Sequence, residues 1–170
     1  MKKITKPAKT DLNDPHIKKI LIALNDNTTA QKVAETGYFF SVVMNAEVIL
    51  LHVIAPQETL PEYSPVIGHL ALDTSSIKKL SSNDGLKMAT RYFLEKSKLR
   101  LGDENIQTIV AEGDSAYEIL RAAERLNVDL IVMGAHNSNW FDKILFRSAI
   151  KRVLNHTSIP LYIVPVKRTN

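Results

Sequence analysis

The chain has 170 residues, of which 45% are hydrophobic and 24% charged. This balance is typical of one globular domain and excludes a largely disordered chain. The chain contains no cysteine, which excludes disulfide bonds, thiolate metal sites and cysteine nucleophiles. The net charge of +4 comes from the two ends, so we expect basic tails over residues 1–16 and 167–170, a neutral domain over residues 17–166, and no nucleic-acid binding.

The first part of the chain alternates apolar runs with a helical pattern. Residues 17–25 (IKKILIALN) form an apolar run that predicts a strand, and Thr28 and Gln31 then have the spacing of a capping box. The helix that follows is expected to end near Asn45. The second apolar run, Glu47–Ile54 (EVILLHVI), predicts a buried strand.

The middle of the chain begins with a segment of little periodicity. Residues 55–76 hold three prolines and one glycine, and they predict a long loop. A helix is expected from about Ser76 to Leu101, with residues 81–85 as a candidate interruption and Gly102 as its end. The short apolar run Ile106–Ala111 predicts a third strand.

Two further pairs of helix and strand complete the pattern. Ser115 and Glu118 have the spacing of a second capping box and predict a helix. Val128–Met133 (VDLIVM) predicts a fourth strand that ends at the following glycine. A helix near Ser148–Asn155 and a fifth strand over Pro160–Val166 are expected after it.

Strands that are apolar throughout and alternate with helices predict a parallel sheet with helices on both faces. Right-handed crossovers make such a sheet doubly wound, so we predict a single-domain α/β fold with five parallel strands. Ligands of these folds bind beyond the carboxyl ends of the strands, where the strand order reverses. The residues at the predicted strand ends are Asn25–Asn27, Val53–Ile54, Gly113–Asp114 and Gly134–Asn137.

The end of the fourth predicted strand has a pattern that suits a ligand. Gly134, His136 and Asn137 lie there, and after nine further residues Arg147 and Ser148 open the next helix. A glycine lets backbone N–H groups approach a ligand, and a serine at a helix N-terminus offers an anion its hydroxyl and the positive end of the dipole. A tight turn and a helix cap are the alternative interpretation of the same residues.

Four strings of the chain resemble the universal stress protein family. They are KKILIALN at the first strand, AEVILLHVI at the second, VDLIVMGAHN at the fourth, and ILFRSAIKRVLNHTSIPLYIVPV up to the last strand. The resemblance covers about residues 17–166 and implies a Rossmann-like sheet with the strand order 3-2-1-4-5. It also implies a homodimer that meets through the edge strand over residues 160–166, where Pro165 limits the backbone pairing. The alternative is an edge covered by the N-terminal tail.

Members of this family that bind ATP carry a glycine, two residues, a second glycine, nine residues, and a third glycine followed by serine or threonine. Here Gly134 and Ser148 match this pattern, whereas Asn137 and Arg147 replace the second and third glycines. Asparagine hinders the close approach of a phosphate. The arginine either occupies the space in which backbone groups would hold a phosphate or binds a phosphate through its charge. The resemblance places Ala149 beside the same phosphates.

The resemblance also assigns the nucleoside end of the site. The family's aspartate at the end of the first strand, near the ribose, corresponds to Asn25, and its backbone contact with adenine corresponds to Val53. A neutral asparagine bonds a ribose hydroxyl more weakly than a carboxylate does. His136 lies within the motif, where it could approach the phosphates or be a solvated loop residue.

The residues and the resemblance together favour a non-enzymatic stress-response homodimer with a degenerate adenine-nucleotide crevice, for which ATP or AMP is the candidate ligand. The alternative is an ATP-binding, slowly hydrolysing switch in which the motif residues from Gly134 to Ser148 hold the phosphates. A third hypothesis is a phosphorylation switch that uses Asp26 and Asp114, although turn and cap roles suit these residues better. The sequence contains no recognisable catalytic constellation or zinc-spaced histidine pair.

The remaining polar and aromatic candidates have structural interpretations. His52 lies inside an apolar strand and is expected to be a hydrogen-bonded core histidine, and His156 is expected to interact with the last carbonyls of a helix. Trp140 and Phe141 are expected to pack over the crevice or against a partner. The basic N-terminus lacks the apolar stretch of a secretory leader, and the longest apolar run is too short to span a membrane, so the cytoplasm is the expected location.

Overall fold

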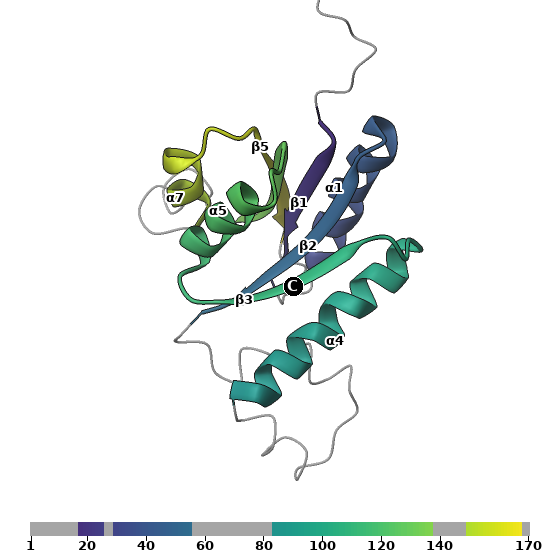
Figure 1. The fold of residues 1–170 in the computed structure, drawn as a ribbon, viewed down its shortest axis with the longest axis vertical. Helices are drawn as coiled ribbons and strands as arrows, with labels where there is room; N and C mark the ends of the chain where they lie inside the picture. Colours follow the sequence, from purple (N-terminus) through teal and green to yellow (C-terminus); the bar gives the residue numbers. More distant parts are fainter. Residues whose placement is uncertain (1–16, 26–28, 56–82, 138–148, 168–170) are drawn as a thin grey trace, which may run out of the picture.

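The computed structural model describes residues 17–25, 29–55, 83–137 and 149–167 (Figure 1). Within these ranges the strands are β1 (Lys19–Ala23), β2 (Glu47–Ile54), β3 (Gln107–Glu112), β4 (Leu130–Asn137) and β5 (Leu161–Lys167). The helices are α1 (Ala30–Met44), α4 (Asn83–Leu101), α5 (Ser115–Arg125) and α7 (Ala149–His156).

The described strands form one parallel sheet in the order β3-β2-β1-β4-β5. From β1 the chain adds β2 and β3 on one side, and it then returns to add β4 and β5 on the other side. The strand order therefore reverses between β1 and β4. These findings confirm the expected doubly wound α/β fold and the expected strand order.

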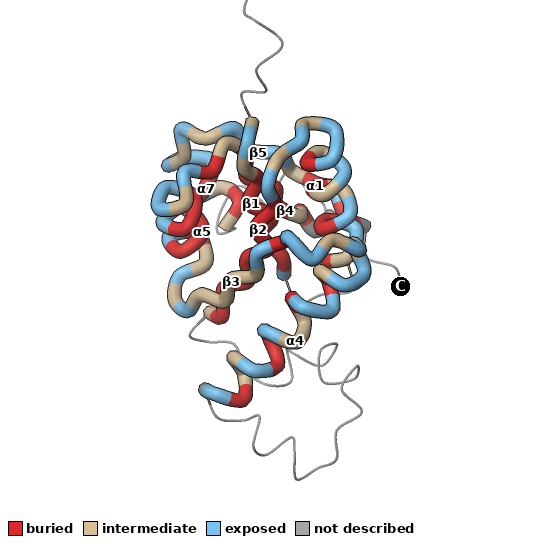
Figure 2. Tube along the Cα trace, turned by 45° about the vertical axis from the view of Figure 1, so that its right-hand side comes forward, coloured by how far each residue is buried: buried red, intermediate tan, exposed pale blue. Residues whose placement is uncertain are grey.

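Helices cover both faces of the sheet, and each face has its own apolar core (Figure 1). α1 and α4 pack on one face, whereas α5 and α7 pack on the other. Successive residues of a strand point to opposite faces, so Leu21 faces α5 and α7 while Ile22 faces α1 and α4. Figure 2 shows the buried residues gathered along the central strands, as a sheet covered on both faces requires.

Two predicted helix ends are confirmed. Asn45 is the C-cap of α1 with a φ of 52°, the left-handed conformation that asparagine tolerates. Gly102 follows α4 with a φ of 72°, and its N–H donates to the carbonyls of Lys98 and Leu99 at 3.2 Å. A residue without Cβ adopts this backbone conformation without strain.

The helix starts differ from the two expected capping boxes. The N-cap of α1 is Thr29, which makes no side-chain cap bond, and Thr28 lies outside the described residues. The N-cap of α5 is Asp114, whose carboxylate accepts a hydrogen bond from the Tyr117 N–H at 3.0 Å. The box predicted from Ser115 is therefore wrong, because Ser115 is already the first residue of the helix.

The fourth strand is displaced along the chain from its predicted bounds of 128–133. It begins at Leu130, after Asp129 accepts hydrogen bonds from the backbone N–H groups of Lys18 and Lys19 at 2.8 and 2.9 Å. It continues to Asn137 because its last residues pair in register with β5. A neighbouring strand supplied these backbone partners, so the glycine at position 134 did not end the strand.

Within the parts of the chain that the structure describes, no helix is both long enough and apolar enough to cross a membrane.

Candidate functional site

The carboxyl ends of β1 and β4 lie side by side where the strand order reverses. Ala23 of β1 pairs with Met133 of β4. Beyond Ala23, Leu24 is still buried, and its N–H donates to the Leu51 carbonyl at 2.8 Å. Asn25 is the first exposed residue after the strand. The structure thus places the predicted ribose-side residue at the edge where ligands of doubly wound folds bind.

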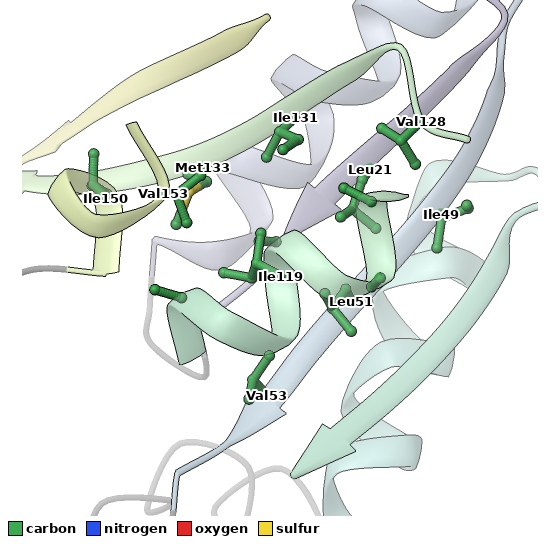
Figure 3. Close-up of a cluster of buried hydrophobic side chains, with 14 of the residues drawn as sticks. Leu21, Ile49, Leu51, Val53, Ile119, Val128, Ile131, Met133, Ile150 and Val153 are labelled. Atoms are coloured by element: carbon green, nitrogen blue, oxygen red, sulfur yellow. The ribbon is translucent and has the colours of Figure 1, made fainter. Parts of the chain in front are cut away.

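Val53 lies near the end of β2, opposite Ala111 of β3. Its side chain is 7% exposed and belongs to the apolar core beneath α5, together with Leu51 and Ile119 (Figure 3). Because the side chain is buried, any contact from Val53 to a ligand at the strand ends has to come from its backbone.

Gly134 lies inside β4 rather than after it, opposite Val164 of β5. A Cβ added to Gly134 would lie 2.6 Å from Cγ2 of Val33 in α1, a separation that real Cβ atoms do not reach. The glycine therefore allows α1 to pack closely on β4. Its expected position in a turn after the strand is wrong, because β4 continues past it.

The rest of the predicted phosphate motif is described only in part. His136 and Asn137 are the last two residues of β4, opposite Val166 and Lys167 of β5. Ala149 is the first residue of α7 and packs partly buried against the core beneath α5. The predicted residues that lie outside the described ranges are Asp26, Trp140, Phe141, Arg147 and Ser148.

His52 is a core histidine with a hydrogen-bond partner, as predicted. It is 3% exposed, and its Nδ1 lies 2.8 Å from the Leu24 carbonyl oxygen at the end of β1. The Phe93 ring of α4 meets the imidazole edge to face, with ring centroids 6.1 Å apart. The Leu24 carbonyl could not be predicted as the partner, because only the pairing of β1 with β2 brings the two residues together.

Asp114 joins two helices at the same edge of the sheet. Besides capping α5, its carboxylate forms an ion pair with Arg152 of α7. The Arg152 guanidinium, and then the Tyr117 N–H, lower the pKa of the Asp114 carboxyl below its ordinary value. The cap role expected for Asp114 is confirmed. Sequence reasoning missed Arg152, which is 38 residues away along the chain.

Two other polar groups have local structural roles. Nδ1 of His156 lies 2.7 Å from the Arg152 carbonyl oxygen, which confirms the expected contact with the last carbonyls of a helix. Glu118 is buried, and its carboxylate lies 2.5 Å from the Arg121 guanidinium one turn later in α5. Among the described residues, no group of three histidine or acidic side chains is placed to hold a metal ion.

The reversed strand order and the polar strand ends place the chain among the doubly wound α/β proteins. The model of the universal stress protein family matches residues 16–165, and the chain belongs to this family. A curated relative is universal stress protein MJ0577 of Methanocaldococcus jannaschii, which is 29% identical over 159 residues. The match covers 90% of this chain and 96% of the relative.

Solved structures share the fold. That of hypothetical protein MJ0577 is 27% identical with a TM-score of 0.63, and the match covers 91% of this chain and 99% of that one. A universal stress protein of Archaeoglobus fulgidus, solved in complex with dAMP, is 13% identical with a TM-score of 0.55 over 86% of this chain and 96% of its own. One solved with cAMP is 14% identical with a TM-score of 0.56 over 88% and 97%. At 13% and 14% identity, these last two structures show only that the fold is shared.

Proposed function

We propose that this universal stress protein is a non-enzymatic stress-response protein with an adenine-nucleotide crevice between the carboxyl ends of β1 and β4, and that the phosphate end of the crevice is weakened. The observation that carries the proposal is the reversal of strand order at this edge, with Asn25 as the first exposed residue beyond β1. In doubly wound sheets this is the position at which ligands bind.

The nucleoside end of the proposed crevice retains groups that suit a nucleoside. The Asn25 side chain offers both a donor and an acceptor to ribose hydroxyls. The Val53 backbone, whose side chain is anchored in the core, is available for the adenine edge. Proteins of the same fold were solved with cAMP and with dAMP, and both ligands are adenosine-type nucleotides with a single phosphate.

The phosphate end of the proposed crevice departs from the family pattern in two places. Asn137 and Arg147 occupy the sequence positions at which ATP-binding members have glycines, and a residue with a side chain hinders the approach of a phosphate to backbone N–H groups more than a glycine does. The retained Gly134 is explained by its packing on Val33. We therefore expect weaker binding of the triphosphate than in members that keep all three glycines.

The proposed assembly is a homodimer that meets through β5. This strand is an edge of the sheet, and it carries an exposed Tyr162 between the half-buried Leu161 and Ile163. An apolar edge strand favours pairing with a second strand, although Pro165 offers no N–H and its carbonyl accepts from Lys32 Nζ at 3.3 Å.

The proposed location is the cytoplasm, with which the absence of cysteine agrees.

Calorimetric titration of the full chain with MgATP and with AMP tests the proposed function. We expect both nucleotides to bind with dissociation constants above about 1 μM, a free energy of binding weaker than about 8 kcal/mol. Tighter binding of MgATP that is lost in Arg147→Ala would favour the ATP switch, in which arginine replaces the backbone cradle. If neither nucleotide binds, the proposal of an adenine-nucleotide crevice is wrong.

A further inference from the structure

The Leu24 carbonyl at the exit of β1 is held by a side chain instead of by the sheet. The register of β1 with β2 ends at the pair Ala23 and Leu51, and the Leu24 N–H then donates to the Leu51 carbonyl. In a continuing parallel ladder the next carbonyl of β1 would accept from a backbone N–H of β2. Here Nδ1 of His52 lies 2.8 Å from that carbonyl oxygen.

The geometry defines which atom carries the proton in this bond. A carbonyl oxygen only accepts hydrogen bonds, so Nδ1 of His52 is the donor. The imidazole is 3% exposed, and the Phe93 ring of α4 packs edge to face against it at an interplanar angle of 77°. Close packing around a buried ring leaves it one orientation, so the donor is fixed relative to the core.

Fixing the Leu24 carbonyl also fixes the start of Asn25. The carbonyl of Leu24 and the N–H of Asn25 belong to one planar peptide unit. The orientation of the carbonyl therefore determines the direction of the Asn25 N–H and the position of its Cα. Leu24 is 3% exposed, whereas Asn25 is exposed, so this peptide unit is the boundary between the core and the proposed crevice.

We propose that His52 is a positioning residue of the nucleotide crevice: its Nδ1–H holds the Leu24 carbonyl and thereby orients Asn25 toward the ligand. The inference rests on the proposed function for the ligand, but the orientation of Asn25 is a property of the free protein. His52 itself touches no ligand in this proposal, because its ring is enclosed between β2 and α4.

Two substitutions of His52 separate the hydrogen bond from the volume of the ring. His52→Asn retains an N–H donor at the distance of Nδ1 from the backbone, whereas His52→Phe retains an aromatic ring without a donor. Ser97→Ala is the matched control, because Ser97 is also 3% exposed on the α4 side and donates only within α4, to the Phe93 carbonyl at 3.1 Å. If His52→Phe does not fold, His52→Gln replaces it, since its longer side chain moves the donor away from the carbonyl.

The readouts are the backbone ¹⁵N order parameter of Asn25 in the free protein and the dissociation constant for AMP. In His52→Phe we expect the order parameter to fall from the rigid range toward about 0.6 and AMP affinity to fall about tenfold. In His52→Asn both values stay near wild type, and in Ser97→Ala only the melting temperature falls. An unchanged order parameter and an unchanged AMP affinity in His52→Phe would overturn the proposal.

The two readouts also distinguish this proposal from the proposed function. If wild-type protein binds no nucleotide, the crevice fails, and the order parameter of Asn25 alone then decides whether His52 orients it. If wild type binds AMP and His52→Phe loses affinity with no change at Asn25, the positioning role is contradicted while the crevice stands.

Discussion

At Gly134 the backbone of β4 and the side chain of Val33 in α1 approach so closely that no Cβ fits between them. The same glycine begins the motif that resembles a phosphate-binding pattern. Two physical demands therefore meet at one position, and only the packing demand follows from the described contacts. A glycine in a family motif can be retained for the core even where the ligand site beside it has changed.

Replacing Gly134 by alanine is expected to destabilise the protein by about 1–3 kcal/mol, the usual cost of overpacking a close-packed core. Adding Val33→Ala should recover part of this loss, because the double variant removes the atom that the new Cβ meets. Urea unfolding of the two single variants and the double variant measures the coupling.

Gly102→Ala serves as the control for this cycle. No atom lies within 4 Å of a Cβ built at Gly102, but its φ of 72° strains any other residue. Its cost of about 1 kcal/mol should be unaffected by Val33→Ala. If Gly134→Ala and Val33→Ala were simply additive, the packing explanation for Gly134 would be wrong.

The elements of this fold differ in how much of them could be predicted from the sequence. The apolar runs of β1 and β2 specified buried parallel strands, because a sheet covered on both faces allows no alternation. The end of β4 could not be predicted, since its last residues are held by β5, which follows much later in the chain. The N-cap of α5 is Asp114, one residue before the predicted Ser115. Both residue types are good caps, so the sequence alone did not decide between them. In the structure Gly113, with a φ of 132°, comes just before the aspartate.

The candidate site was predictable only where it depends on strand ends. Asn25 and Val53 were located correctly at the carboxyl edge, because strand direction in a parallel sheet places them there. The contacts of His52 with Leu24 and of Asp114 with Arg152 were missed. Both join segments distant in sequence, and no local pattern encodes such a pairing.

The ion pair between Asp114 and Arg152 makes the junction of α5 and α7 sensitive to acid. Arg152 and the Tyr117 N–H lower the pKa of Asp114 in the folded state. The folded-state pKa is therefore below that of the unfolded chain, in which the pKa of an aspartate is about 3.9. Its contribution to stability is therefore fully present above the unfolded pKa and is lost as the pH falls through the folded pKa.

Asp114→Asn is expected to remove this acid-dependent contribution while keeping an oxygen that can cap α5. The difference in unfolding free energy between wild type and variant should be constant near neutral pH and shrink as the pH falls below about 4. Arg152→Gln should reproduce part of the effect. Curves of wild type and Asp114→Asn that stay parallel down to about pH 2 would show that the pair does not stabilise the folded state.

At the scale of the whole molecule, β5 is an edge of the sheet, and the proposed homodimer depends on it. Tyr162 is 40% exposed at the start of this strand, and its ring centroid lies 4.7 Å from that of Phe40 in α1. The aromatic contact fixes the edge against α1 and leaves part of the ring facing outward. An edge strand with a partly exposed aromatic side chain suits the proposed pairing with a second copy.

Light scattering on the protein as it elutes from a size-exclusion column measures its mass in solution and tests the proposed dimer. Wild type is expected to have about twice the 19.1 kDa mass of one chain, because two β5 edges would pair with each other. Tyr162→Lys should shift the mass toward one chain, since lysine on an edge strand opposes pairing, whereas Tyr162→Phe should keep the dimer. A monomeric wild type, or a dimer unaffected by lysine, would exclude β5 as the interface.

In the proposed crevice, Asn137 and Arg147 weaken the phosphate end, whereas Asn25 and the Val53 backbone at the nucleoside end still suit an adenine nucleoside. The most direct measurement is the ratio of MgATP to AMP affinity, by calorimetry, in wild type and in a variant that carries Asn137→Gly and Arg147→Gly together. We predict that the double variant binds MgATP at least about tenfold more tightly, with AMP affinity nearly unchanged. Equal or weaker MgATP binding by the double variant would contradict the claim.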